Sequence, residues 1–273
     1  MEHPKLAICN FMDDDDKLRE MALALGFSGV DWTFRPEDLP GTEIGESRLL
    51  NRIEKFQPLE IRYHCAFNGL DLGDADPRRA EWAAETFMRA CRIVSFLDGR
   101  FMTVHLGLGR ESYEDLSWNR SVEGLADLVS LGEALGVRVC LENLASGWSS
   151  RPELFEKLVR KSGAGVTLDI GHARMSPSVR RQRFAFEDFI APHYDRICNA
   201  HIYHEEREDK HTPPTRLGDM VERLGLLSWL PCDWWVLELR EESALIQTLG
   251  VVREFLEAAP VEKPQEYLAM VQN

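Results

Sequence analysis

The sequence lacks the features of exported, membrane-spanning and disulfide-rich proteins. None of its apolar runs approaches the ~18 residues that cross a bilayer, and its first residues, MEHPKLAICNF, lack the apolar segment of a signal peptide. Its six cysteines, at positions 9, 65, 91, 140, 198 and 232, form no CxxC pair. We therefore expect reduced cysteines, a cytoplasmic location and no membrane partner.

Basic charge is also scarce. The chain has 32 lysine and arginine residues against 46 aspartate and glutamate residues, so its formal net charge is −14. An acidic chain is repelled by DNA and by anionic membranes, and a nucleic-acid partner would require a locally basic face. We expect a small-molecule substrate instead, and the composition is compatible with an oligomer.

Short apolar runs alternate with longer amphipathic stretches along the whole chain, which is the pattern of successive strand–helix units. Eight of these runs have the length and the β-branched content of strands. They are LAICNF (6–11), GVDWTF (29–34), LEIRYH (59–64), RFMTVH (100–105), VRVCLEN (137–143), GVTLDI (165–170), ICNAHI (197–202) and WWVLELR (234–240).

Helical stretches separate these runs. Residues 76–97 and 119–135 repeat apolar positions at three and four residues, 151–163 has proline near its start and glycine at its end, and the acidic DDDDK (13–17) suits the first turn of a helix. Eight such repeats predict one (β/α)8 TIM barrel domain over residues 1–273, with the barrel at about 5–258 and a tail at 259–273. An open doubly wound sheet would show a glycine-rich loop after its first strand. NFMDDDDK is no such loop, so we expect no nucleotide cofactor.

Polar residues close most of the later strands, where the active sites of such barrels lie. They are His64, His105, Glu142, Asp169, His172, His201 and Glu238. Any one of them alone would most simply be a hydrogen-bonded structural residue. Six strands meeting at one mouth would bring several carboxylates together, and a divalent cation would offset their repulsion and desolvation. Mixed carboxylate and imidazole ligands suit Zn²⁺ or Mn²⁺, with Co²⁺, Fe²⁺ and Mg²⁺ as alternatives.

The order and spacing of several motifs resemble the xylose-isomerase-like barrel superfamily, which includes sugar isomerases, sugar epimerases and AP endonucleases. The motifs are VHLG (104–107), LENLASG (141–147), LDIGH (168–172), AHIYH (200–204), DKHTPP (209–214) and LEL (237–239). Three positions depart from the usual pattern: HLG replaces HPG, TPPTRLGDM is a loose version of a glycine-rich turn, and His204 stands where aspartate is common.

The resemblance implies a metal held by Glu142, Asp169, His201 and Glu238. In epimerase-like members the two glutamates also remove and return a proton beside a carbonyl that the metal polarises, and the histidine matching His172 contacts substrate.

In the AP endonuclease branch, the matching residues hold three zinc ions. The first set is His64, His105 and Glu142, the second is Glu142, Asp169, His201 and Glu238, and the third is His172, Asp209 and His211. All of these positions are filled in this chain.

Residues around the mouth are candidates for substrate contact. Arg174, in the basic loop ARMSPSVRRQRF (173–184), could clamp a phosphate or carboxylate, and strand alternation would place Arg240 on the same side as Glu238. Trp32, Phe67 and Trp148 could wall a sugar-sized pocket. Solvated loop arginines and packed aromatic residues are the simpler interpretations. His3 and His193 match no motif and are expected at the surface.

Three classes of function follow from these observations. The first is a metal-dependent isomerase or epimerase of a sugar, sugar phosphate or polyol, which the acidic charge favours; a lyase would use the same proton abstraction. The second is a multinuclear zinc phosphodiesterase resembling AP endonucleases. The third is a non-catalytic or partner-dependent metal-binding barrel.

Overall fold

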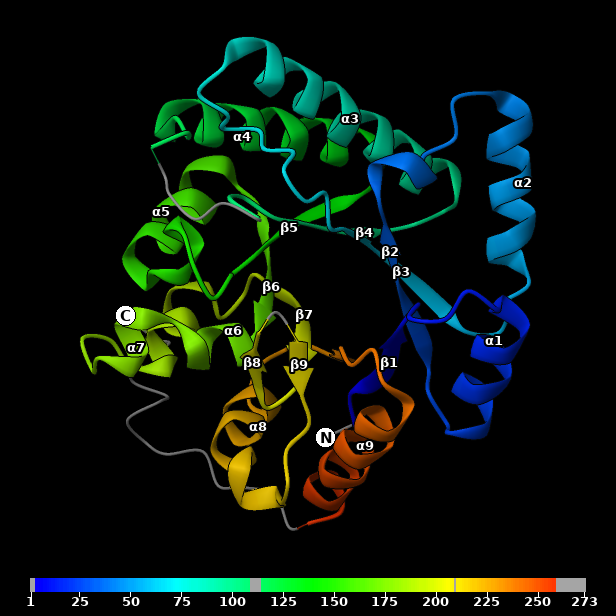
Figure 1. Ribbon diagram of the computed structural model, residues 1–273, viewed down its shortest axis with the longest axis vertical. Coiled ribbons are helices and arrows are strands. Elements are labelled where there is room, and N and C mark those ends of the chain that lie inside the picture. Colours follow the sequence, from blue (N-terminus) through cyan, green and yellow to red (C-terminus); the bar gives the residue numbers. More distant parts are fainter. Residues whose placement is uncertain (1–2, 109–113, 209, 259–273) are drawn as a thin grey trace.

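The computed structural model describes residues 3–108, 114–208 and 210–258. Eight parallel strands close into a barrel in the order β1-β10-β7-β6-β5-β4-β3-β2 (Figure 1). They are β1 (Lys5–Cys9), β2 (Gly29–Phe34), β3 (Glu60–Cys65), β4 (Phe101–Val104), β5 (Arg138–Glu142), β6 (Gly165–Asp169), β7 (Ile197–Ile202) and β10 (Trp234–Leu237). The predicted (β/α)8 barrel is confirmed, and each of the eight predicted runs overlaps one of its strands, with ends that differ by up to three residues.

Helices surround the barrel, as Figure 1 shows. The longer ones are α1 (Asp15–Ala24), α2 (Glu43–Glu54), α3 (Pro77–Phe96), α4 (Trp118–Leu135), α5 (Pro152–Ser162), α8 (Val221–Ser228) and α9 (Glu242–Glu257). The acidic DDDDK segment starts a helix as predicted, because the Asp14 side chain accepts a hydrogen bond from the Lys17 amide at 3.1 Å. At the end of α5, Gly163 adopts a left-handed conformation (φ 77°), which glycine takes without a Cβ penalty.

The connections after β6 and β7 depart from the regular rhythm. After β6 the chain forms two short helices, α6 (Ile170–Met175) and α7 (Pro177–Arg180), followed by the single 3-10 turns η3 (Phe186–Phe189) and η4 (Ala191–His193). After β7 it forms an antiparallel hairpin of β8 (Glu205–Arg207) and β9 (Lys210–Thr212), and the short turn η5 (Leu217–Asp219) precedes α8. Two further 3-10 turns are η1 (Pro36–Asp38) and η2 (Trp148–Ser150). These irregular segments carry residues of the candidate site.

The barrel interior is polar at both ends. Near the amino ends of the strands, the Arg62 guanidinium lies between the rings of Phe101 and Trp234, with centroids at 4.0 and 4.4 Å, and donates to Asn199 Oδ1 at 2.7 Å. One layer higher, the Thr103 and Thr167 hydroxyls share a hydrogen bond of 2.7 Å. The polar groups of both layers bond to one another inside the barrel, so the candidate reactive groups are those at the carboxyl ends of the strands.

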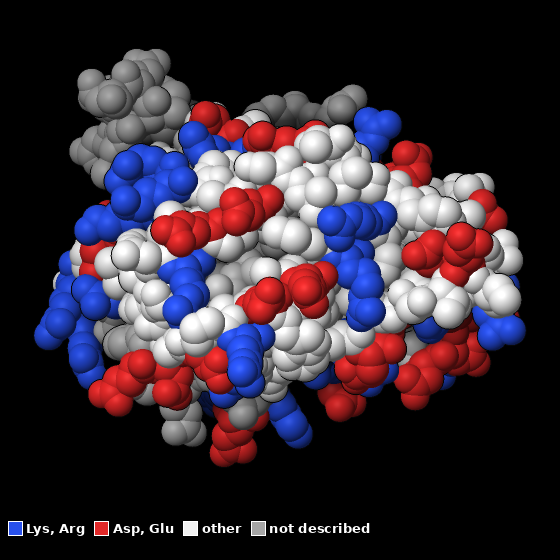
Figure 2. All heavy atoms as spheres, turned by 90° about the horizontal axis from the view of Figure 1, so that it is seen from above, with Lys and Arg blue, Asp and Glu red and all other residues white. Residues whose placement is uncertain are grey.

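The charges on the surface are mixed. In Figure 2, lysine and arginine side chains alternate with acidic ones over the face in view, and no broad basic region appears among the described residues there. Within the described ranges, no helix combines the length and apolar character needed to cross a bilayer.

Candidate metal centre

The carboxyl ends of six strands bring histidine and acidic side chains to one mouth. The residues are His64 (β3), His105 (after β4), Glu142 (β5), Asp169 (β6), His201 (β7) and Glu238 (after β10), joined by Asp31 from the middle of β2 and by His172, Glu206 and His211 from the segments after β6 and β7. Among the described residues their ligand atoms fall into four groups, each within 4.8 Å, and three of the groups share residues. The sequence-predicted ligands thus lie together, apart from Asp209, which lies outside the described residues.

One group is a triangle of two ring nitrogens and a carboxylate oxygen. His64 Nε2 lies 3.1 Å from His105 Nε2, and Glu142 Oε2 lies 3.4 Å from the first nitrogen and 2.9 Å from the second. Ligands of tetrahedral zinc at bond lengths near 2.0 Å stand roughly 3.3 Å apart. The three atoms of the triangle therefore have the spacing of three ligands of one divalent ion.

The second group shares Glu142. His201 Nδ1 lies 3.4 Å from Glu142 Oε2 and 3.1 Å from Glu238 Oε2, and Asp169 completes the group. Three buried atoms of the group, namely His201 Nδ1, Asp169 Oδ2 and Glu238 Oε2, have no hydrogen-bond partner among the described residues. Buried polar atoms are rarely left unpaired, so this set of atoms fits a metal ion.

A third group lies nearer the solvent. His172 Nε2 lies 3.4 Å from Glu206 Oε2, and His211 completes the cluster. Glu206 belongs to β8, so the hairpin after β7 carries a carboxylate back over His172. Sequence reasoning assigned Glu206 no role, because a glutamate in a charged loop gives no local signal of its orientation.

Local hydrogen bonds hold the ends of β5 and β6 in register. The Asn143 side chain accepts from the Asp169 amide and donates to the Asp169 carbonyl oxygen, both at 2.9 Å. The backbone carbonyl oxygen of Asn143 is 3.0 Å from His172 Nδ1. Asp169 also caps α6 by accepting from the His172 amide at 2.7 Å. Sequence reasoning missed Asn143, although it directly follows Glu142.

Gly171 allows the close packing that this D-x-x-H turn requires. A Cβ atom at this position would lie 2.1 Å from the ring of Tyr203, which is buried and stacks on His211 with ring centroids 3.7 Å apart. The glycine therefore leaves room for the Tyr203 ring, which packs against His211.

The electrostatics of the centre couple acids to histidines. Burial by itself would raise the pKa of Glu142, but the neighbouring His201 and His105 hold that pKa well below the usual 4.5. Burial opposes charge on His201 as well, yet Glu142 and Glu238 raise its pKa well above 6.5. For Asp169, burial dominates, and with the adjacent carboxylates it raises the pKa to about 6. In the absence of a cation, protons stabilise this cluster of acids.

The predicted aromatic pocket residues lie elsewhere. Trp32 packs edge-on against Phe56, at 5.3 Å between centroids, and Phe67 packs against Phe87 of α3 at 4.8 Å. Both are buried in the hydrophobic core. For Trp32 the reason is strand alternation, because its neighbour Asp31 faces the barrel axis. The pocket-wall prediction is therefore wrong for these two residues. Trp148 is partly buried against Trp118.

Arg174 and Arg240, the two predicted anion contacts, lie in different surroundings. Arg174 is half-exposed, with Nε 3.6 Å from Glu205 Oε2 near the outer group. The placement of Arg240 by strand alternation is wrong, because β10 ends at Leu237 and the chain turns, with the Leu239 amide donating to the Leu237 carbonyl. Arg240 is exposed beyond that turn.

Two other histidines lie outside the centre. The expectation that His193 lies at the surface is wrong: it is buried, its ring contacts Phe155, and burial lowers its pKa to about 4. His204 Nδ1 faces the guanidinium of Arg223, in α8, at 3.3 Å.

A known family pattern matches most of the chain. The description of that family is "Xylose isomerase-like TIM barrel", and the match covers residues 20–249. The chain belongs to this family. Two uncharacterized proteins of Methanocaldococcus jannaschii are similar to this chain in sequence. MJ0008 is 28% identical over 166 residues, which is 60% of this chain and 71% of that protein, and MJ1614 is 24% identical over 168 residues, covering 58% and 62%.

Solved structures share the fold of this xylose isomerase-like barrel. A D-tagatose 3-epimerase-like protein superposes with a TM-score of 0.73 at 18% identity, covering 93% of this chain and 97% of its own. Endonuclease IV from Thermus thermophilus superposes with a TM-score of 0.66 at 20% identity, covering 94% and 100%. One of these structures is named for an epimerase-like protein and the other for an endonuclease, and at these identities the likeness shows the fold alone.

Proposed function

We propose that this protein is a metal-dependent hydrolase of a small phosphoester, with a centre of at least two divalent ions. The observation that carries the proposal is the shared Glu142. One of its oxygens lies within 3.4 Å of the ligand nitrogens of His64, His105 and His201, which belong to two different ligand groups. Glu142 would therefore be a ligand common to both groups, which together would hold two ions.

The same geometry weakens a role for Glu142 as a base. His172 Nδ1 approaches its other oxygen at 3.5 Å, so four ring nitrogens surround a side chain that is 1% exposed. A carboxylate that is buried and held by four imidazoles, and whose pKa is strongly lowered, is a poor acceptor for a proton on substrate carbon. Hydrolysis does not require such an acceptor.

His64, His105, Glu142, Asp169, His201 and Glu238 would hold the ions, which when bound supply charge stabilisation and activate water. Glu238 is the more accessible carboxylate, at 13% exposure, and its Oε2 faces His201. Arg174 at the rim would bind a substrate phosphate through its guanidinium.

A small substrate fits the charge of the chain better than DNA does. The net charge is −14, and on the face shown in Figure 2 acidic side chains of the described residues interleave with the basic ones, so that face offers no continuous basic track for a nucleic-acid backbone. A local cation such as Arg174, together with bound metal ions, is sufficient for a single phosphate group.

A substrate panel tests the proposal. Protein freed of metal with EDTA is reloaded with Zn²⁺, Mn²⁺ or Co²⁺ and incubated with phosphomonoesters, phosphodiesters and an abasic DNA duplex at low salt. We expect metal-dependent release of product from a small ester, and its loss in Glu142→Gln but not in Glu156→Gln, a surface control. Cleavage of the duplex with no turnover of small esters would contradict the small-substrate proposal. Inactivity with every phosphoester would contradict hydrolysis.

A sugar isomerase or epimerase is the second candidate. The second ligand group, which contains Glu142, His201 and Glu238, favours it. Glu142 and Glu238 both approach His201, so a single ion there would leave two glutamates beside a bound substrate. This candidate predicts exchange of a substrate α-proton with solvent deuterium across a sugar, sugar-phosphate and polyol panel. A lyase would add loss of water to the same exchange. A non-catalytic barrel would bind metal without any of these reactions.

A further inference from the structure

We propose that Asp31 is a positioning residue that orients one histidine ligand in each of two metal positions. The inference rests on the metal centre of the proposed function and assigns a role to a side chain that none of the sequence motifs includes. Asp31 lies in the middle of β2, is 1% exposed, and pairs in register with Cys9 of β1 and Arg62 of β3.

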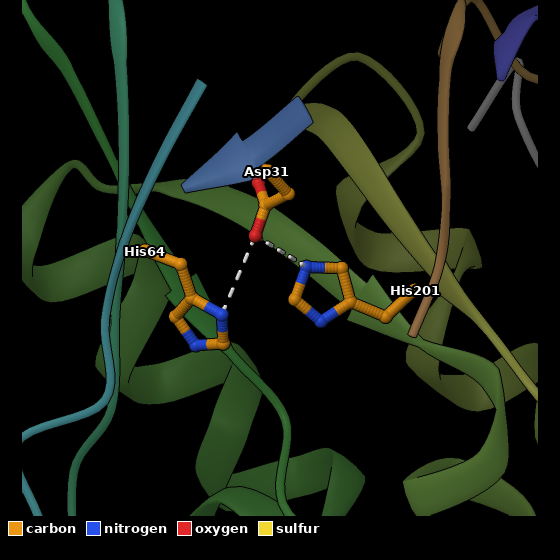
Figure 3. Close-up of side chains that lie close together, drawn as sticks. All are labelled: Asp31, His64 and His201. Carbon is orange, nitrogen blue, oxygen red and sulfur yellow. Dashed lines mark ion pairs between the residues drawn. The ribbon is translucent and has the colours of Figure 1, made fainter. Parts of the chain in front are cut away.

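The Asp31 carboxylate points between two imidazole rings (Figure 3). Its Oδ2 atom lies 3.4 Å from His64 Nδ1 and 3.9 Å from His201 Nε2. Neither Asp31 oxygen has a hydrogen-bond partner among the described residues, and the same holds for these two ring nitrogens. Three unsatisfied buried groups thus face one another.

The nitrogens that face Asp31 are the ones that the ligand groups do not use. His64 directs Nε2 toward His105 and Glu142, and His201 directs Nδ1 toward Glu142 and Glu238. A neutral imidazole that binds a metal through one nitrogen carries its proton on the other. Both remaining N–H groups would therefore be aimed at the same carboxylate, which would fix the tautomer and the tilt of both rings.

Neighbouring groups do not replace this role. The Arg62 guanidinium is directed away from the mouth, to Glu60 at 3.1 Å and Asn199 at 2.7 Å. The next acceptor near His64 Nδ1 is Glu238 Oε1, which is farther away at 4.0 Å. Glu238 also belongs to the core ligand group, whereas Asp31 does not.

Direct ligation of a metal by Asp31 is the alternative. Asp31, His64 and His201 offer one ligand atom each within 4.8 Å. Through the nitrogens that face Asp31, however, both histidines would turn their metal bonds away from Glu142, and the triangle with His105 would lose a member. The positioning role keeps every ligand group intact.

The test uses the full-length protein, stripped with EDTA and titrated with Zn²⁺ against a competing chelator. We expect Asp31→Asn to weaken zinc binding by about 10- to 100-fold, the usual effect of removing an outer-shell partner, at both positions. Thr167→Val is the matched control: it removes another buried polar group from the barrel interior, and we expect zinc affinity within about twofold of wild type. Wild-type affinity at either position in Asp31→Asn would overturn the inference.

A second measurement does not depend on the folding of the variant. In the zinc-loaded wild type, proton NMR with ¹⁵N-labelled histidine should show two ring N–H protons, of His64 and His201, shifted downfield and protected from exchange. Absence of both signals, or a zinc-bound crystal structure with the ion on Asp31, would overturn the inference. Wild-type protein that binds no zinc would overturn the proposed metal centre as well, so the two failures are distinguishable.

Discussion

Replacing Glu142 with glutamine should abolish most of the stabilisation that metal ions give to this protein. Glu142 belongs to both inner ligand groups, so one change affects two ions. An ion present at 100 times its dissociation constant stabilises the fold by about 2.7 kcal/mol. For a chain of this size, about 1 kcal/mol corresponds to roughly 2–4 °C in Tm. We therefore expect a rise of about 5–11 °C for each ion bound by the wild type.

The glutamine variant keeps one carbonyl oxygen but loses the charge that both ions require. If each affinity falls about 100-fold, the same metal concentration equals the new dissociation constant and the gain shrinks to about 0.4 kcal/mol per ion, or roughly 1–2 °C. Differential scanning calorimetry of EDTA-treated protein, with and without added Zn²⁺, measures both values. Glu156→Gln on the surface of α5, where the carboxylate pairs with Arg160 at 2.6 Å, should keep the wild-type gain. A full metal-dependent rise in Glu142→Gln would refute the shared-ligand account.

Two further predictions concern the metal-free protein and the D-x-x-H turn. The pKa of His201 is raised above 6.5, so its contribution to the free energy of unfolding is complete below pH 6.5 and is lost as pH rises through the folded-state pKa. The pKa of Glu142 is lowered, so its contribution is complete above pH 4.5 and is lost as pH falls through the folded-state pKa. Urea unfolding in EDTA should therefore show greatest stability between these values, and stability that climbs above pH 6.5 would contradict the pKa directions. Gly171→Ala should lower the free energy of unfolding by about 1–3 kcal/mol, because the added Cβ meets the Tyr203 ring. In α9 a Cβ added at Gly250 has none of the neighbouring atoms within 4 Å, so Gly250→Ala should be neutral or stabilising by about 0.5–1 kcal/mol. Equal urea midpoints for the two variants would contradict the packing account.

The barrel, and the meeting of its polar strand-end residues at one mouth, could be predicted from sequence because two local signals agreed. Apolar runs of strand length recur with helical stretches between them, and polar residues such as Glu142 and Asp169 end those runs. Since parallel strands of a barrel all end at one mouth, the position of a residue at a strand end is sufficient to predict its neighbours.

Other features depend on information that the sequence does not carry locally. Which face of β2 points inward decides between Asp31 and Trp32, and only the register of the closed barrel fixes it. Glu206 reaches His172 through a hairpin of three-residue strands, which are too short to give a periodic pattern. Arg240 was placed by extending strand alternation past Leu237, where the strand has ended.

The number of metal ions per chain tests the central claim most directly. Protein stripped with EDTA, reloaded with Zn²⁺ and freed of excess metal can be weighed by native mass spectrometry and assayed for zinc content. The shared Glu142 predicts at least two tightly bound ions per chain, with both lost in Glu142→Gln. The result that would contradict the dinuclear centre is one ion per chain, with the same zinc content after His64 and His105 are replaced. That result would favour a mononuclear isomerase or epimerase.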